Sequence, residues 1–162
     1  MPDALVEQHV KPASDDASLI QAIRLAAIDT LERFTARSFQ RRAWRMTCDG
    51  FACAITLPRS PVSQVTSITY LDANGVSQQV AAWRQSGDVV MPVAHSTWPV
   101  TLSGAGTLTI DFVAGFDDIG ASAPSLRMAA LLMMRHLYDG GDEAVPGPIA
   151  ALCRGYRVPV IA

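Results

Sequence analysis

The chain has 162 residues, of which 49% are hydrophobic and 17% are charged, and its formal net charge at pH 7 is −2. This composition excludes a disordered chain and a strongly basic nucleic-acid-binding protein. The charged fraction is below the roughly 25% of an average globular protein, which indicates that part of the surface meets other protein instead of water. Twelve of the thirteen basic residues are arginine. A GC-rich genome produces this bias, and protein interfaces also favour it.

The cysteines and the longest apolar run limit the compartment in which we expect the protein. Cys48, Cys53 and Cys153 show no CxxC spacing, so the sequence predicts neither a disulfide framework nor a zinc site, and we expect a reducing compartment. The apolar run at residues 128–134 is too short to span a bilayer. Charged residues near the N-terminus are unlike a secretory signal. We therefore expect synthesis in the cytosol and no membrane partner.

The first predicted elements are an arm and a long helix. Residues 1–14 have no hydrophobic period and are predicted to be an extended or mobile arm. Serine and aspartate residues at 14–18 then form an N-cap signal. Apolar residues follow at helical spacing as far as Phe34, so we place the first helix at residues 15–38.

Residues 44–115 are predicted to form an antiparallel β unit, because turn sequences recur about every eight to twelve residues. Residues 72–75 end in Asn-Gly and predict a tight turn. The clearest strand is 107–113, where apolar residues alternate with threonine and aspartate. Helices and strands do not alternate along the chain, which excludes a doubly wound sheet. The predicted fold class is therefore α+β: a helical layer with an inserted antiparallel β unit, in a single domain of residues 1–162.

The second long helix is predicted at residues 122–139, with Pro124 in its first turn and a glycine pair beyond its end. Apolar side chains surround nearly its whole cylinder, and such a helix must be buried on all sides. It is either wedged between the first helix and the β unit, or packed on its own domain on one side and on a neighbouring subunit on the other. The second arrangement predicts a subunit interface formed by Met128, Ala130, Met133 and Leu137.

The C-terminal segment, residues 146–162, is predicted to contain a short helix near 149–153 and an extended tail from Arg154. The tail interleaves apolar side chains with tyrosine and arginine, which are favoured interface anchors. Two interpretations stay open. The tail packs on its own β unit, or it docks on another protein through Arg154, Tyr156, Arg157 and Val158.

Residue patterns typical of catalysis are not found in the sequence. Gly104-Ala105-Gly106 precedes a strand, whereas a dinucleotide fingerprint follows a strand and opens a helix. The three histidines lack metal-ligand spacing, and no serine or cysteine stands in a nucleophile motif. The sequence therefore predicts no enzyme, no cofactor and no metal site.

Five arginines fall within residues 33–45, and Glu32 is the nearby acid. One interpretation is a solvated helix end, where cations complement the helix dipole. The other is a positive patch that contacts nucleic acid or an acidic partner. In both, we expect Arg37, Arg41 and Arg42 to lie on the surface.

Several short segments occur in an order that points to a known family. They are the helix ending 31–39, Trp44, 55–62, 65–75, Trp98-Pro99, 110–116, the helix ending 136–138, and 155–158. Over about residues 14–158, this order resembles the head-tail adaptor (connector) proteins of long-tailed phages, prophages and gene transfer agents. The chain departs from the family at Ala36, where glycine is usual, and in its short segment between Tyr138 and Tyr156.

The resemblance implies a structural, non-enzymatic virion protein. Family members form a ring below the portal protein, dodecameric like the portal, which extends the DNA channel and presents a surface to the head-completion (stopper) and tail proteins. The expected location is the virion neck, with the host cytoplasm before assembly. The resemblance also favours docking of the tail segment on the portal or the next subunit. The alternatives that stay open are another neck or tail-completion protein, a small nucleic-acid-binding module, and a small α+β enzyme.

Overall fold

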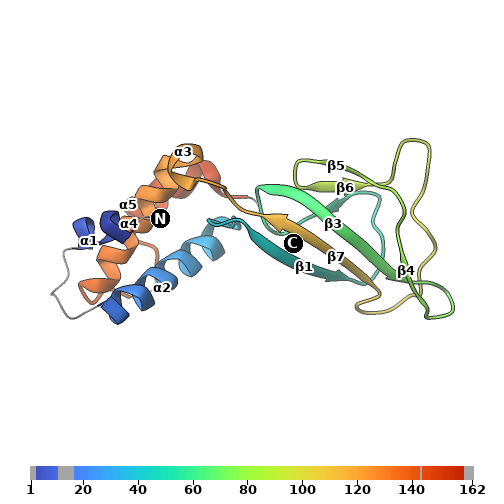
Figure 1. The fold of residues 1–162 in the computed structure, drawn as a ribbon, viewed down its shortest axis with the longest axis horizontal. Helices are drawn as coiled ribbons and strands as arrows, with labels where there is room; N and C mark the ends of the chain where they lie inside the picture. The colour runs from blue at the N-terminus through green and yellow to red at the C-terminus, as the bar shows by residue number, and fades with distance from the viewer. Residues whose placement is uncertain (1–2, 11–16, 143, 159–162) are drawn as a thin grey trace. The chain divides into compact units, whose positions relative to one another are not determined.

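The computed structural model describes residues 3–10, 17–142 and 144–158. The chain divides into two compact units, a helical unit from residues 1–39 and 116–162 and a β unit, Gln40–Gly115 (Figure 1). The predicted α+β class is confirmed. The β unit begins at Gln40 instead of at the predicted residue 44 and ends at the predicted Gly115. That the two units form one domain stays a prediction.

The two predicted long helices are present with shorter ends. They are α2 (Ala17–Thr35) and α4 (Pro124–Tyr138). The N-cap predicted for α2 falls within residues 11–16, which lie outside the described residues. α2 ends three residues before the predicted 38, because Ala36 takes a left-handed φ of +56°. Pro124 stands at the start of α4, as predicted, where its missing N–H leaves no helical hydrogen bond unmade.

Two short helices contradict the sequence predictions. α1 (Asp3–Val10) replaces the arm predicted at 1–14, of which residues 1–2 and 11–14 lie outside the described residues. α1 is stabilised by burial, because Val6 and Val10 are only 2% and 1% exposed. α3 (Ile119–Ser122) begins before the second predicted helix, where no element was predicted. It is capped by the Asp118 carboxylate, which accepts a hydrogen bond from the N–H of Gly120.

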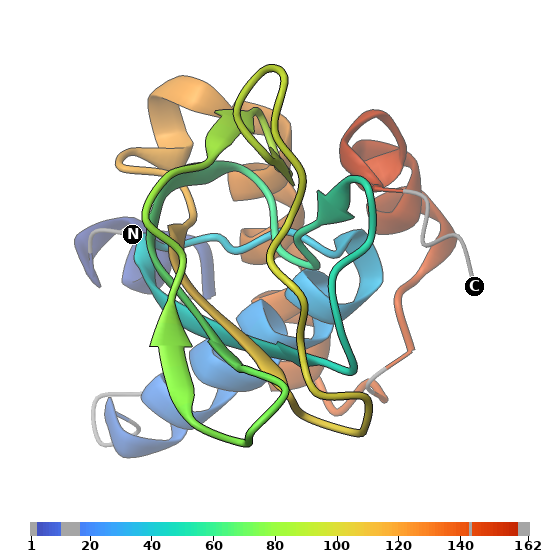
Figure 2. The same ribbon diagram turned by 90° about the vertical axis from the view of Figure 1, so that its right-hand side faces the viewer.

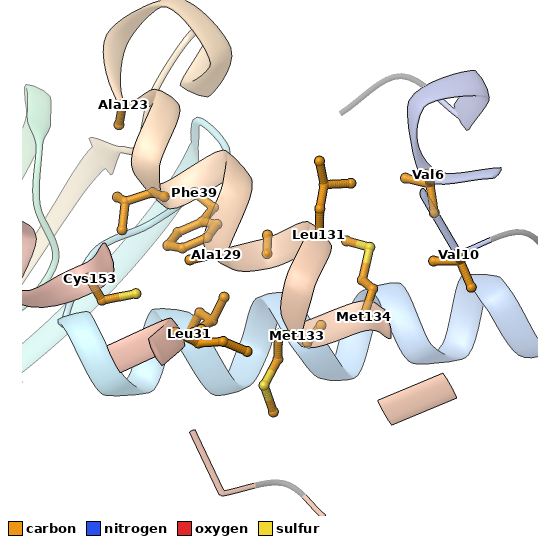
Figure 3. Close-up of a cluster of buried hydrophobic side chains, with 14 residues drawn as sticks. Val6, Val10, Leu31, Phe39, Ala123, Ala129, Leu131, Met133, Met134 and Cys153 are labelled. Atoms are coloured by element: carbon orange, nitrogen blue, oxygen red, sulfur yellow. The ribbon is translucent and has the colours of Figure 1, made fainter. Parts of the chain in front are cut away.

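The core of the helical unit is built around α4. α1, α2, α3 and α5 (Gly147–Cys153) all pack against α4. Figure 3 shows Val6 and Val10 of α1 directed toward Met134. Five α4 side chains have no exposed surface: Leu126, Ala129, Ala130, Met133 and Met134. Helices of the same unit therefore cover most of α4, while Met128 stays 45% exposed. Contact of that exposed side with a neighbouring subunit stays a prediction.

The β unit contains two antiparallel sheets. The larger has the strand order β1-β7-β3-β4, and the smaller has the order β2-β6-β5. The central strands β3 and β7 run side by side (Figures 1 and 2). The bounds of the strands are β1 (Arg42–Cys48), β2 (Ile55–Thr56), β3 (Val62–Leu71), β4 (Ser77–Gln79), β5 (Arg84–Ser86), β6 (Val89–Met91) and β7 (Leu108–Ala114).

Local patterns explain the centre of this unit. The alternation predicted at 107–113 is that of β7, whose Leu108, Ile110 and Phe112 are buried in the core of the β unit. The tight turn predicted at 72–75 is also present. The Asp72 carboxylate accepts hydrogen bonds from the N–H groups of Val76 and Asn74, which hold its pKa below the usual value of aspartate.

The β unit closes on itself at a glycine. Gly115 has φ +123°, and a Cβ added there would lie 2.2 Å from the carbonyl oxygen of Gln40. No side chain fits so near to backbone, so the first and last residues of the β unit approach each other only because Gly115 has none.

The end of α2 yields the first prediction. Ala36→Gly should raise the free energy of unfolding by about 1 kcal/mol, because the left-handed conformation strains every residue that has a Cβ. Urea unfolding followed by circular dichroism measures the change. The matched control is Ala22→Gly, at an exposed position within α2, which should lower the free energy of unfolding by about 1 kcal/mol. If both variants are destabilised alike, the strain at Ala36 is not real.

Candidate assembly surfaces

The C-terminal segment folds back on the end of α2. The N–H of Val158 donates to the carbonyl of Thr35 at 3.1 Å, and the Arg37 Nε donates to the carbonyl of Tyr156. The Arg37 guanidinium also lies 5.9 Å from the Tyr156 ring centroid. Arg157 lies 4.7 Å from the ring centroid of Phe34 in the last turn of α2. The tail thus caps a helix end, where carbonyl groups lack intrahelical donors and cations are favourable.

This geometry corrects the predicted tail. Residues Arg154–Tyr156 form a 3₁₀ turn, η1, instead of an extended strand. The described tail packs on the end of α2 in the helical unit, a contact that neither interpretation from the sequence included. Among the four predicted docking residues, Arg154 and Arg157 are exposed, while Tyr156 and Val158 are half-buried. Residues 159–162 lie outside the described residues. Docking of the segment on another protein stays a prediction.

The predicted subunit interface on α4 divides into buried and exposed residues. Ala130 and Met133 have no exposed surface, so the prediction is wrong for these two residues, which belong to the core. Met128 is 45% exposed and Leu137 is half-buried. A contact with another subunit through Met128 or Leu137 stays a prediction.

The predicted arginine patch divides between the two units. Arg37 belongs to the helical unit and is half-buried against Tyr156, so it is less exposed than expected. Arg41 and Arg42 belong to the β unit and are exposed. The guanidinium of Arg42 lies 4.3 Å from the ring centroid of Trp44, and that of Arg59 lies 4.7 Å from the same ring. Such cation–π contacts hold the side chains in place without neutralising their charge.

Glu32 has a local structural role that the sequence did not reveal. Its side chain is buried, with the residue 2% exposed, and Oε1 accepts hydrogen bonds from the N–H of Phe39 at 2.6 Å and the hydroxyl of Ser38 at 3.5 Å. The carboxylate thereby fixes the backbone that follows α2. The sequence pattern identified Glu32 only as an acid near the arginines, and not as a residue that holds the backbone.

One ion pair crosses the exposed face of the larger sheet. Arg45 donates to both Asp111 oxygens at 2.7 and 3.2 Å, and the Ser67 hydroxyl donates to Asp111. These hydrogen bonds, of which the one from Arg45 has the largest effect, hold the pKa of Asp111 below its usual value. The stabilisation is present at neutral pH and is lost as the pH falls through the lowered pKa of Asp111. It is small, because the pair is exposed.

A pocket of about 580 Å³ lies among the loops of the β unit. Phe51 and Trp98 stack in its wall, with ring centroids 4.7 Å apart. Its titratable lining residues are Asp49 and Cys53, and an Asp49 oxygen already accepts the N–H of Gly106. The lining therefore holds one carboxylate and not a pair.

The loops around the pocket carry exposed apolar side chains. Val93, Val100 and Leu102 are 38%, 80% and 38% exposed. A neutral, apolar and aromatic loop surface is typical of contact with protein.

Metal sites and membrane-spanning helices are the two further features considered for the described residues. No group of three or more histidine, cysteine, aspartate or glutamate side chains among them could hold a metal ion. No helix in the same part of the chain has the length and hydropathy needed to cross a membrane.

No family model and no curated protein matches the chain. Solved structures do match it. A chain in the neck of an empty gene transfer agent (GTA) particle, computed with C6 symmetry, aligns with a TM-score of 0.82 and 26% identity over 100% of this chain and 91% of that chain. A chain of the native GTA virion aligns with a TM-score of 0.80 and 28% identity, over 100% of this chain and 91% of that chain. A chain in the native GTA neck, computed with C12 symmetry, aligns with a TM-score of 0.80 and 29% identity, over 99% of this chain and 90% of that chain. These neighbours confirm the resemblance to head-tail adaptors.

The cap on α2 yields the second prediction. Deletion of residues 154–162 should lower the free energy of unfolding by about 2 kcal/mol, because the contacts of Tyr156 and Val158 with the end of α2 are lost. Arg37→Gln should remove about half of that amount. Arg41→Gln, at an exposed position, is the matched control and should change stability by less than about 0.5 kcal/mol. A truncated chain that melts like the full-length chain would show that the tail does not support α2.

Proposed function

We propose that this chain is a structural protein of a virion neck, forming a connector ring that joins the DNA-filled head to the tail. One observation carries the proposal: chains in GTA necks align with this chain over almost its whole length, with TM-scores from 0.80 to 0.82. A likeness that includes both the helical unit and the β unit is stronger support than any short motif.

We further propose a closed ring of identical copies, with twelve subunits. The symmetries of the similar necks, C6 and C12, support a ring. The proposed partners are the portal protein on one side and the head-completion and tail proteins on the other. DNA passes through the channel without sequence recognition. The proposed location is the virion neck, after a stage in the host cytoplasm.

The surfaces support an assembly role over an enzymatic one. Exposed apolar side chains occur in both units, which is typical of proteins that bury surface in an assembly. The pocket of the β unit, with Asp49 and Cys53, offers no acid–base pair. We therefore propose that the protein is not an enzyme.

Two groups of arginines receive separate roles in this proposal. Arg41 and Arg42, exposed in the β unit, face either the DNA of the channel or an acidic neighbour. Arg154 and Arg157, exposed on the tail, contact the portal or the next subunit. Arg37 is removed from the patch, because it holds the tail on the helical unit.

The third prediction tests the neck role. DNA-filled heads that carry a portal but no adaptor should bind the purified chain at the portal vertex, and electron microscopy should show a ring there. Heads that lack the portal are the control and should bind nothing. If the chain ignores portal-containing heads but binds free DNA with a steep salt dependence, it is a nucleic-acid-binding module and not a neck protein.

A further inference from the structure

The outward side of α2 carries apolar side chains that the described residues leave exposed. Leu19, Ala22 and Leu25 follow one another at intervals of three residues, a spacing that forms a ridge on a helix. Leu19 is 49% exposed and Leu25 is 60% exposed. Ala27 and Leu31 have no exposed surface and face the core, so Leu25 points away from it. Leu19 lies at the side of the helix, closer to the core. We name these three residues the α2 outward face.

A second apolar surface lies on α4. Met128 is 45% exposed, and Leu132, which is half-buried and packs partly against the core, follows one turn later. Ala130 and Met133 are turned into the core, so Met128 points away from it. We name Met128 and Leu132 the α4 outward face.

Each outward face has an exposed ion pair at its edge. Asp29 and Arg33 pair at 3.1 Å beside the α2 outward face. Arg135 and Asp139 pair at 2.7 Å beside the α4 outward face. An apolar centre with a polar rim that carries both signs of charge is the usual anatomy of a protein–protein contact. Such surfaces do not resemble a nucleic-acid-binding site, which requires an excess of positive charge.

A closed ring requires a particular kind of surface from each subunit. Its contacts run head to tail, so every copy must present two different surfaces that fit each other. The helical unit presents two apolar surfaces of similar kind, on two different helices. Similar chains stand in assemblies of C6 and C12 symmetry, in which copies are related by rotation.

We propose that the α2 outward face of one copy packs against the α4 outward face of the next copy. This inference rests on the proposed ring and names its subunit contact. Leu25 and Met128 are the central pair of the interface, since each is the most exposed large apolar residue on its face. Burial of apolar side chains at the centre of a contact removes them from water, which stabilises the contact.

Cysteine cross-linking tests the pairing directly. Leu25→Cys and Met128→Cys are made in separate full-length chains, each with the exposed Cys53→Ser, and the two proteins are mixed under mild oxidation. The mixed disulfide should dominate over either homodimer, because the contact joins unlike faces. Ala151→Cys, exposed on α5, is the matched control and should link to neither partner. Homodimers that form as readily as the mixed disulfide would overturn the inference.

Charge substitution provides a second test of the inference. Leu25→Asp and Met128→Asp should melt like the wild type, since both side chains are exposed, and should each weaken ring formation at least about tenfold in native mass spectrometry. If the wild type joins portal-containing heads as a ring and both variants do so equally well, only this inference fails. If the wild type neither associates nor joins heads, the proposed function fails with it.

Discussion

The burial of α4 is the constraint on which the helical unit depends. A helix that is apolar on nearly all sides has no stable place in water, so every side must meet another element. α2 and α5 supply part of that cover, and α1 completes it through Val6 and Val10. The result is a subunit with a closed core before any assembly. What remains for neighbours is limited to side chains such as Met128, which stay outside the core.

The end of α2 joins this core to the rest of the chain. The positive φ of Ala36 stops the helix, the buried Glu32 carboxylate fixes the backbone at Phe39, and Arg37 and Val158 tie the tail to the same place. Local contacts of residues 32–39 and long-range contacts of the tail thus meet at one helix end. This arrangement holds the last described residues in one defined position against the helical unit.

Sequence reasoning succeeded where the signal was local and failed where burial depended on distant partners. The alternation in β7, the turn at Asp72 and the proline at the start of α4 are local, and each was predicted correctly. α1 has only eight residues, too few for its periodicity to be recognised, and it is stabilised by α4 from the far end of the chain. The same cause led to the error at Ala130 and Met133. An all-round apolar helix shows that cover is needed, but not whether a neighbour or the same chain provides it. The arginines were grouped by proximity in the sequence, which could not show that Arg37 belongs to one unit and Arg41 and Arg42 to the other.

The central claim is that α4 is buried within its own subunit, and α1 tests it most directly. Val6→Asp places a charge where the native residue is 2% exposed, and it should lower the free energy of unfolding by at least about 3 kcal/mol. Gln8→Asp, at an exposed position of the same helix, should leave it nearly unchanged. The measurement is urea unfolding of both variants beside the wild type. Val6→Asp unfolding at the same urea concentration as Gln8→Asp would contradict the account, because α4 would then not depend on α1 for its burial.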